Sequence, residues 1–451
     1  MKRFLASSLI LSLAISGLAL TATVRQSGQT LMNAAGIAAR VDDWIQPYVA
    51  AGDFSGAVLI AEGDRVLAEK RYGMADFVRG VPNRIGTRFR VASLSKTLTA
   101  AAVEILIDRG KIHLSDPLGS YVPGIANGGQ ITVEQLLSHQ SGVGALDTAD
   151  RYRDCLDPSE WLRRLRQVKP LFAPGKGDQY SNEGYFLLAL IVERASGMPY
   201  DRFLQENIFG PLGMKDTGSA CRELPPGPNA AGHVPGAAPR SVVPLPFNEA
   251  VEIGPGSIYS SARDMLAWLR AVDTNEAFSV GRFKYPYGWG RRNYSGRNLI
   301  EQSGILEGYD AHMALYPQEH IRAVVLGNIQ SGFFNRIPKD LEAVLFGGKI
   351  SRPPEANPFR AAAQELKSCA GEYATDAIPY HQTLAIQSDA LAMRWGNFPF
   401  WRGLAPIGKD AFFFRYEYAT VRFTRDKAGN VIQMSWQWEG GDPMVFRKLG
   451  P

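Results

Sequence analysis

The sequence predicts an α/β chain of the α+β type, in which helices flank an antiparallel sheet and a helical insertion interrupts it. A small all-β domain follows. Two observations lead to this prediction. Strand-like alternation occurs at both ends of the region up to about residue 346, with helical periodicity between them. After about residue 362, short alternating runs separated by turns replace the helical pattern.

The first region begins with a helical segment, residues 41–51, and a strand hairpin around Glu62-Gly63-Asp64. The hairpin strands are expected at residues 56–61 and 65–71. Three further helices are expected to start at Ser93, at Glu183 and, after the N-caps Ser260 and Ser261, at Ala262. Strands at residues 309–316 and 321–326 then complete the sheet, so both ends of this region contribute to it.

The domain organisation follows from composition. A first domain is expected at residues 35–346, a linker rich in glycine and proline at 347–361, and a barrel or sandwich at 362–451. Alternating runs mark the strands of the last domain, at residues 383–386, 391–395, 421–424 and 431–438.

The N-terminus predicts export. Lys2 and Arg3 precede an apolar stretch, residues 4–20, and small residues follow it, which is the layout of a signal peptide over residues 1–22. We expect cleavage and a periplasmic or secreted protein. The alternative is an uncleaved anchor, because the stretch approaches spanning length. No later segment is apolar enough to span a bilayer.

Composition excludes several classes of function. The net charge of the 451 residues is only +5, and the charges are scattered, which argues against nucleic-acid binding. The six histidines show no metal-ligand spacing, so neither a metal nor another cofactor is expected. Cys155, Cys221 and Cys369 match no zinc or redox pattern. A Cys155–Cys221 disulfide and three unpaired thiols both remain open, as does the oligomeric state.

Ser93 and Lys96 are the candidate nucleophile and base. On a helix they lie three residues apart and share one face. A serine hydroxyl attacks a carbonyl efficiently only when a neighbouring base removes its proton, and a lysine can do so when burial disfavours its ammonium form. The chain contains no Gly-x-Ser-x-Gly nucleophile elbow, which argues against an α/β-hydrolase.

Tyr180 and Asn182 form the second candidate element, in the segment Tyr180-Ser181-Asn182 just before a helix. A phenol can pass a proton to a leaving group, and an asparagine can orient both the substrate and the lysine. A structural role in a buried turn is the alternative for this segment taken alone.

Together these segments resemble the serine β-lactamase and penicillin-binding protein clan, in its class C-like branch. Phe89 to Thr97 is similar to the clan's nucleophile segment, and Pro174 to Tyr185 to its second motif. Leu136 to Gly142, Phe209 to Met214 and Ser260 to Asp264 are similar to further landmarks in the same order. The resemblance implies a β-lactamase/transpeptidase-like fold, with Ser93, Lys96 and Tyr180 catalytic and Asn182 binding substrate. His139, in one of these landmarks, is expected to have a structural role.

The third motif departs from the clan's pattern. Where the resemblance implies Lys or His, then a small residue and glycine, this chain has Gln302-Ser303-Gly304. Gln302, Ser303, Gly304 and Ile305 are therefore expected to bind substrate, and the resemblance implies an oxyanion hole made by the backbone N–H groups of Ser93 and Ile305. A neutral amide can donate hydrogen bonds but cannot pair with a substrate carboxylate.

Two functional hypotheses follow. The first is an exported serine hydrolase that cleaves an amide, lactam or ester of a small molecule or peptide. The loss of the cation favours an esterase, D-amino peptidase or carboxypeptidase over a true β-lactamase. The second is a weakly active or inactive binding or sensor protein for cell-wall peptides. The retained Ser93, Lys96, Tyr180 and Asn182 favour the enzyme.

Overall fold

The computed structural model describes residues 33–146, 157–221, 223–245, 251–274, 287–355, 359–378, 381–396, 398 and 400–450. The predicted signal peptide, residues 1–22, and Cys155 lie outside the described residues, so neither the signal nor a disulfide of Cys155 is tested. Cys221 and Cys369 are free thiols.

Six strands of the described residues form an antiparallel sheet in the order β10-β11-β12-β13-β1-β2. Gly56 at the start of β1 pairs with Gly327 at the end of β13, so the sheet joins the two ends of the first region. This confirms the predicted α+β fold. The strands are β1 (Gly56–Glu62), β2 (Arg65–Tyr72), β10 (Gly290–Tyr294), β11 (Arg297–Leu306), β12 (Tyr309–Tyr316) and β13 (Ile321–Gly327).

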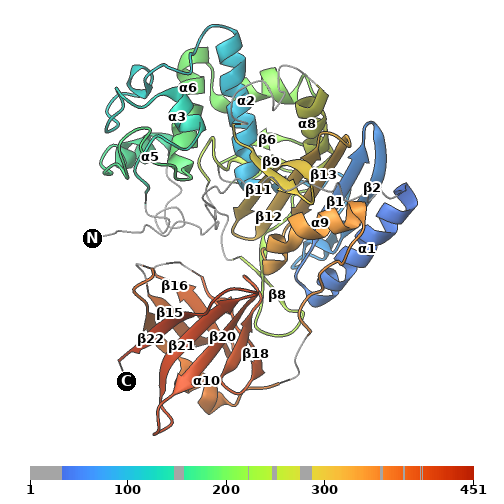
Figure 1. The fold of residues 1–451 in the computed structure, drawn as a ribbon, viewed down its shortest axis with the longest axis vertical. Helices are drawn as coiled ribbons and strands as arrows, with labels where there is room; N and C mark the ends of the chain where they lie inside the picture. Colours follow the sequence, from blue (N-terminus) through green and yellow to red (C-terminus); the bar gives the residue numbers. More distant parts are fainter. Residues whose placement is uncertain are drawn as a thin grey trace.

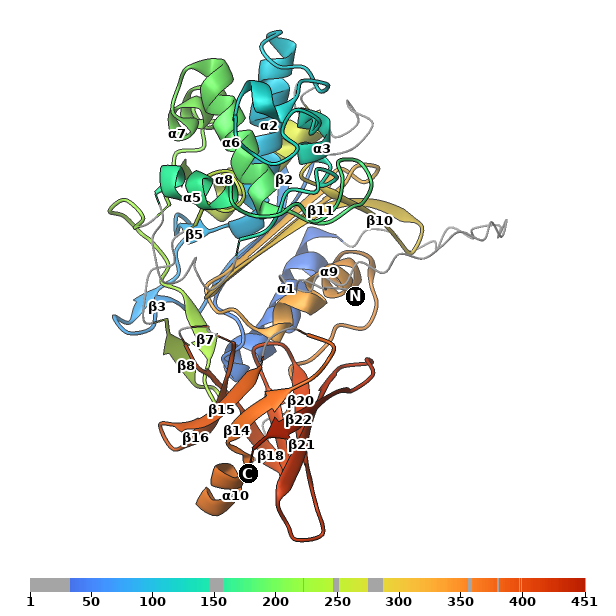
Figure 2. The same ribbon diagram turned by 90° about the vertical axis from the view of Figure 1, so that its left-hand side faces the viewer.

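Helices cover both faces of this sheet (Figures 1 and 2). On one face α1 (Ala34–Ala51) and α9 (Ile337–Phe346) pack together over the buried side chains of Val58 and Ile60. On the other face α8 (Ala262–Thr274) packs against β1, β12 and β13. Leu59 of β1 belongs to this second core, which continues into α2 (Ser95–Asp108) and α6 (Asn182–Ser196).

The segment between β2 and β10 carries the helical insertion and several short strands. Its remaining helices and helical turns are η1 (Ala92–Leu94), η2 (Leu118–Ser120), α3 (Val133–Leu137), α5 (Pro158–Leu165), α7 (Tyr200–Leu204) and the π-helical turn η3 (Gln205–Phe209). The short strands are β3 (Met74–Asp76), β4 (Val81–Pro82), β5 (Phe89–Arg90), β6 (Gly218–Ser219), β7 (His233–Pro235), β8 (Val242–Pro244) and β9 (Ile258–Ser260). The 3₁₀ turn η4 (Gly332–Arg336) precedes α9.

The C-terminal part forms a barrel-like antiparallel sheet, here called the C-terminal barrel, in the order β17-β16-β15-β14-β22-β21-β20-β19-β18. It lies at the opposite end of the molecule from α2 and α6 (Figure 1). Its strands are β14 (Gly371–Ala374), β15 (Gln382–Gln387), β16 (Ala390–Trp395), β17 (Arg402–Gly403), β18 (Ala405–Gly408), β19 (Ala411–Phe414), β20 (Ala419–Arg425), β21 (Val431–Trp438) and β22 (Met444–Leu449). The helix α10 (Ala363–Cys369) packs against β15 and β16. The predicted domain boundaries, including the linker at 347–361, stay predictions.

The first helix is longer than the sequence pattern predicted. It begins at Ala34 rather than Val41, because the side-chain oxygen of Asn33 accepts a hydrogen bond from Gly36 N and caps the helix. Gly52 ends it in the left-handed conformation, with φ of 73°. Within the described part of the chain, no helix is both long and apolar enough to cross a membrane.

Candidate active site

Ser93 lies in the 3₁₀ turn η1, and α2 begins two residues later at Ser95. The helix expected from about Ser93 therefore begins two residues later, after this turn. Ala92 adopts φ of 48°, a left-handed conformation that is uncommon for a residue other than glycine. The chain thus turns sharply between β5 and α2, and Ser93 sits on that turn.

Two side chains donate hydrogen bonds to the hydroxyl oxygen of Ser93. The phenol of Tyr180 lies 2.7 Å away, and the Nζ atom of Lys96 lies 3.2 Å away. Tyr180 comes from the loop before α6, 87 residues along the chain from Ser93. The structure therefore brings the three predicted catalytic residues together around one oxygen atom.

Lys96 is fully buried, and its amine has further uncharged partners. It donates to the side-chain oxygen of Asn182 at 2.7 Å and to the backbone oxygen of Pro255 at 3.1 Å. Its Nζ atom also lies 4.6 Å from the centre of the Tyr180 ring. Asn182 is thus in contact with the lysine, as its predicted orienting role requires. Sequence reasoning missed Pro255, because a backbone carbonyl leaves no side-chain signal, although Gly254-Pro255-Gly256 does mark a turn.

His139 supports the loop that carries Tyr180. Its Nδ1 atom accepts a hydrogen bond of 3.1 Å from the backbone N–H of Ser181. Its ring lies 4.8 Å from the ring of Tyr180 and 5.1 Å from that of Tyr185. Burial, together with the charge of Lys96, lowers the pKa of His139 to about 3. A neutral imidazole that accepts from a backbone N–H fits the predicted structural role.

The third motif lies on β11, and its glutamine contacts the backbone on both sides. The Gln302 amide nitrogen donates to the Gly288 carbonyl oxygen at 2.6 Å, and its oxygen accepts from Ser303 N at 2.9 Å. Gly288 itself lies against the backbone of Lys96. Gln302 therefore ties the strand to the segment that supports the lysine.

Gly304 and Ile305 continue β11 past the nucleophile. A Cβ atom on Gly304 would lie 2.9 Å from Ser93 N and 2.4 Å from the carbonyl oxygen of Val91, so only glycine fits here without a shift. The side chain of Ile305 is 45% exposed. This half of β11 extends beyond the pairing with β10, which ends at Glu301. The strand segment from Gln302 onward thus runs alongside the serine turn.

Ser303 makes a contact that sequence reasoning missed. Its hydroxyl lies 2.9 Å from Nδ1 of His312, which stands opposite it on β12. Burial is the main reason that the pKa of His312 falls to about 3. The alternation of β12 could have placed His312 on this face, but the register between the strands was not predictable.

No group of three or more potential metal ligands occurs among the described residues.

Comparison with known proteins identifies the family of the chain. The family model named Beta-lactamase matches residues 41–345. The chain is 32% identical over 286 residues to the esterase EstB of Burkholderia gladioli, covering 55% of this chain and 73% of EstB. It is 29% identical over 318 residues to the D-alanyl-D-alanine-carboxypeptidase/endopeptidase AmpH of Escherichia coli (strain K12), covering 62% of this chain and 80% of AmpH. Among solved structures, the octameric penicillin-binding protein homologue from Pyrococcus abyssi matches with a TM-score of 0.60 at 21% identity, covering 92% of this chain and all of that chain.

The chain belongs to the beta-lactamase family of hydrolases, whose fold it shares with penicillin-binding proteins. The family contains proteins named for ester and for peptide substrates, so membership alone does not decide between them.

Proposed function

We propose that this protein is a serine hydrolase that forms an acyl-enzyme on Ser93. The observation that supports the proposal is the convergence of Tyr180 OH and Lys96 Nζ on the Ser93 hydroxyl oxygen, at 2.7 and 3.2 Å. Both distances are short enough for proton transfer to and from that oxygen.

In the proposed reaction, Lys96 first loses its ammonium proton to water, and its amine then takes the proton of Ser93 as the hydroxyl oxygen bonds to the substrate carbonyl carbon. The site surrounds Lys96 with uncharged partners, the surroundings in which a lysine can serve as a base. The backbone N–H groups of Ser93 and Ile305 stabilise the oxyanion of the tetrahedral intermediate. As the intermediate collapses, Tyr180 passes a proton to the leaving alcohol or amine, and Lys96 restores the Tyr180 proton.

Water then attacks the acyl-enzyme by the reverse route. Lys96 and Tyr180 take one proton from the water as its oxygen bonds to the acyl carbon. They deliver a proton to Ser93 Oγ as the bond between that oxygen and the acyl carbon breaks, which releases the acid. Asn182 holds the Lys96 amine in place during both steps.

Neutral esters and amides are the proposed substrates. Gln302 occupies the position where the family resemblance implies a cation, and its amide is engaged with Gly288 and Ser303. A substrate carboxylate therefore gains no ion pair from this residue. The esterase named among the relatives supports the same choice. We also propose that the chain is exported, on the strength of its N-terminal charged and apolar segments.

Labelling with a fluorophosphonate, followed by intact-mass analysis, tests the acyl-enzyme proposal. We expect one adduct on the wild type and none on Ser93→Ala. The matched control is Ser95→Ala, which removes a buried hydroxyl that accepts a hydrogen bond from Ile258 N and should leave the adduct in place. An unlabelled wild type, or an adduct that persists in Ser93→Ala, contradicts the proposal. N-terminal sequencing of the protein recovered from the periplasm or medium tests export.

A further inference from the structure

The β11–β12 hairpin ends in a turn that the C-terminal barrel contacts directly. Glu307 follows β11, two residues after Ile305, and its carboxylate is buried. It accepts hydrogen bonds from Arg402 Nη2 at 2.8 Å and from the phenol of Tyr416 at 2.9 Å. Both donors belong to the C-terminal barrel, so one side of the turn is held from outside the central sheet.

Arg402 is held rigidly for this contact. Its side chain is almost completely buried, and aromatic rings of the barrel surround its guanidinium group. The guanidinium carbon lies 4.0 Å from the ring centre of Trp395, 4.1 Å from Phe400 and 4.4 Å from Tyr416. Cation–π attraction and the Glu307 ion pair together offset the loss of hydration. The arginine thus has one defined position from which to hold the turn.

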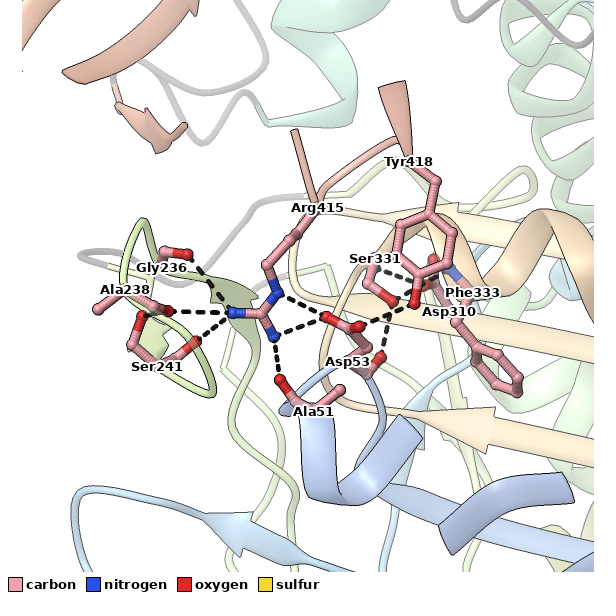
Figure 3. A network of polar contacts seen from close by, with 10 residues as sticks. All are labelled: Ala51, Asp53, Gly236, Ala238, Ser241, Asp310, Ser331, Phe333, Arg415 and Tyr418. Carbon is pink, nitrogen blue, oxygen red and sulfur yellow. Dashed lines mark hydrogen bonds and ion pairs between the residues drawn. The ribbon is translucent and has the colours of Figure 1, made fainter. Parts of the chain in front are cut away.

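A second arginine of the barrel is linked to the other side of the same hairpin indirectly, through Asp53 and Ser331 (Figure 3). Arg415 donates to Oδ1 of Asp53 at 2.6 and 2.8 Å, and Tyr418 donates to Oδ2 at 2.8 Å. The backbone oxygen of Asp53 accepts from Ser331 Oγ at 2.6 Å. The backbone N–H of Ser331 donates at 3.1 Å to Asp310.

Asp310 connects this second series of hydrogen bonds to the site, because it stands opposite Ile305 in the pairing of β11 with β12. Its carboxyl group is buried, and burial raises its pKa well above the usual value. Between Glu307 and Asp310, the backbone N–H of Gly308 donates to the side-chain oxygen of Gln330 at 3.1 Å. The tip of the hairpin is therefore fixed at residues 307, 308 and 310.

We propose that the C-terminal barrel positions the oxyanion-binding strand, with Arg402 as the positioning residue that acts through Glu307. The inference rests on the proposed function, since it assigns the Ile305 N–H group to the oxyanion. A backbone N–H stabilises an oxyanion only at a defined distance and angle, so a small shift of the hairpin reduces the rate without removing the serine or its base.

The test compares Arg402→Lys, Arg402→Gln, Tyr416→Phe and Glu307→Gln with the wild type in hydrolysis of p-nitrophenyl butyrate. Rates are divided by the fraction of sites that a fluorophosphonate labels, so that unfolded protein does not count. Arg425→Ala is the matched control, because Arg425 pairs with Asp410 inside the barrel at 2.6 Å. Binding of phenylboronic acid, whose tetrahedral serine adduct uses the oxyanion hole, is measured alongside.

We expect kcat per labelled site to fall about 10- to 100-fold in Arg402→Gln, less than the full loss of an oxyanion donor, with KM within about threefold. The boronate affinity should fall in parallel with kcat/KM, Tyr416→Phe should lose less, and Arg402→Lys should recover part of the loss. Arg425→Ala should match the wild type. If the variants retain wild-type kcat per labelled site and lose only labelled sites, Arg402 is merely structural and the inference is wrong. A wild type with neither labelling nor turnover contradicts the proposed function instead.

Discussion

Gly304 lies so close to Ser93 that a side chain on it would collide with the serine backbone. The nearest approach of a Cβ atom to Ser93 N would be 2.9 Å, and to the Val91 carbonyl oxygen 2.4 Å. Strand β11 and the serine turn are therefore packed backbone to backbone, which leaves the strand edge beside the nucleophile.

Replacing this glycine should separate the strand from the serine. We expect Gly304→Ala to lower kcat/KM for p-nitrophenyl butyrate about 100-fold, because both proposed oxyanion donors lie at this contact. Gly129→Ala is the control, since a Cβ atom there meets nothing within 4 Å. Steady-state kinetics on both variants measure this difference. Equal kcat/KM values would contradict the prediction, because β11 would then accommodate the added methyl group without displacing the oxyanion donors.

A cation at position 302 should change substrate preference. We expect Gln302→Lys to raise kcat/KM for nitrocefin, which bears a carboxylate, about tenfold relative to p-nitrophenyl butyrate, because an ion pair adds roughly 1.4 kcal/mol. Gln302→Met is the neutral control and should leave the ratio unchanged. An unchanged ratio in the lysine variant would show that residue 302 does not reach the substrate carboxylate.

His139 should make stability depend on pH. The folded protein binds a proton at this histidine only near pH 3, whereas an unfolded chain binds it below about pH 6.5. The unfolded state therefore gains protons first, and the stability from neutral His139 is complete above pH 6.5 and declines toward pH 3.

From pH 7.5 to 5.0, this one histidine should lower the free energy of unfolding by about 2 kcal/mol. In His139→Asn the amide oxygen can still accept the hydrogen bond of Ser181 N, and the pH dependence should be smaller by that amount. Urea denaturation at both pH values measures the difference. His113→Asn serves as control, because His113 is 72% exposed. Parallel pH curves for wild type and His139→Asn would contradict the prediction.

The Asp53–Arg415 pair should matter for stability because it is buried. Removing one partner leaves an uncompensated charge, so Arg415→Ala should lower the free energy of unfolding by about 3–5 kcal/mol. Arg352→Ala breaks an exposed pair with Asp43 and should cost less than about 1 kcal/mol. Combining Arg415→Ala with Asp53→Asn, which removes the charge but keeps an oxygen that can accept from Tyr418, should recover much of the loss. A loss of less than about 1 kcal/mol in Arg415→Ala would contradict the prediction, because it would equal the loss expected for an exposed ion pair.

Local patterns in the sequence predicted much of the fold. The turn at Glu62-Gly63-Asp64, the glycine after α6 and the alternation of β12 and β21 are short-range signals, and the structure has the corresponding elements. The start of α1 was missed because Asn33 lies outside the apolar periodicity that marked the helix.

The candidate site was predictable where side chains carry the chemistry. The contacts of Ser93 with Lys96 and Tyr180 follow from motifs, although the turn at Ala92 does not. The contact of Pro255 with Lys96 depends on backbone geometry, and that of Ser303 with His312 depends on strand register. The ion pair of Arg402 with Glu307 depends on how the C-terminal barrel docks, and no local pattern encodes that arrangement.

The pairing of β1 with β13 has a consequence for how the chain folds. Gly56 meets Gly327, so the strand that opens the central sheet lacks one neighbour until more than 270 further residues have been synthesised. Contacts between such distant residues form slowly, because the entropy of closing a long loop is lost before strand pairing can offset it. Val58 and Leu59, which face opposite cores, lack their partners on β13 during that time. A chain that completes its core this late stays incompletely folded until most of it has been synthesised.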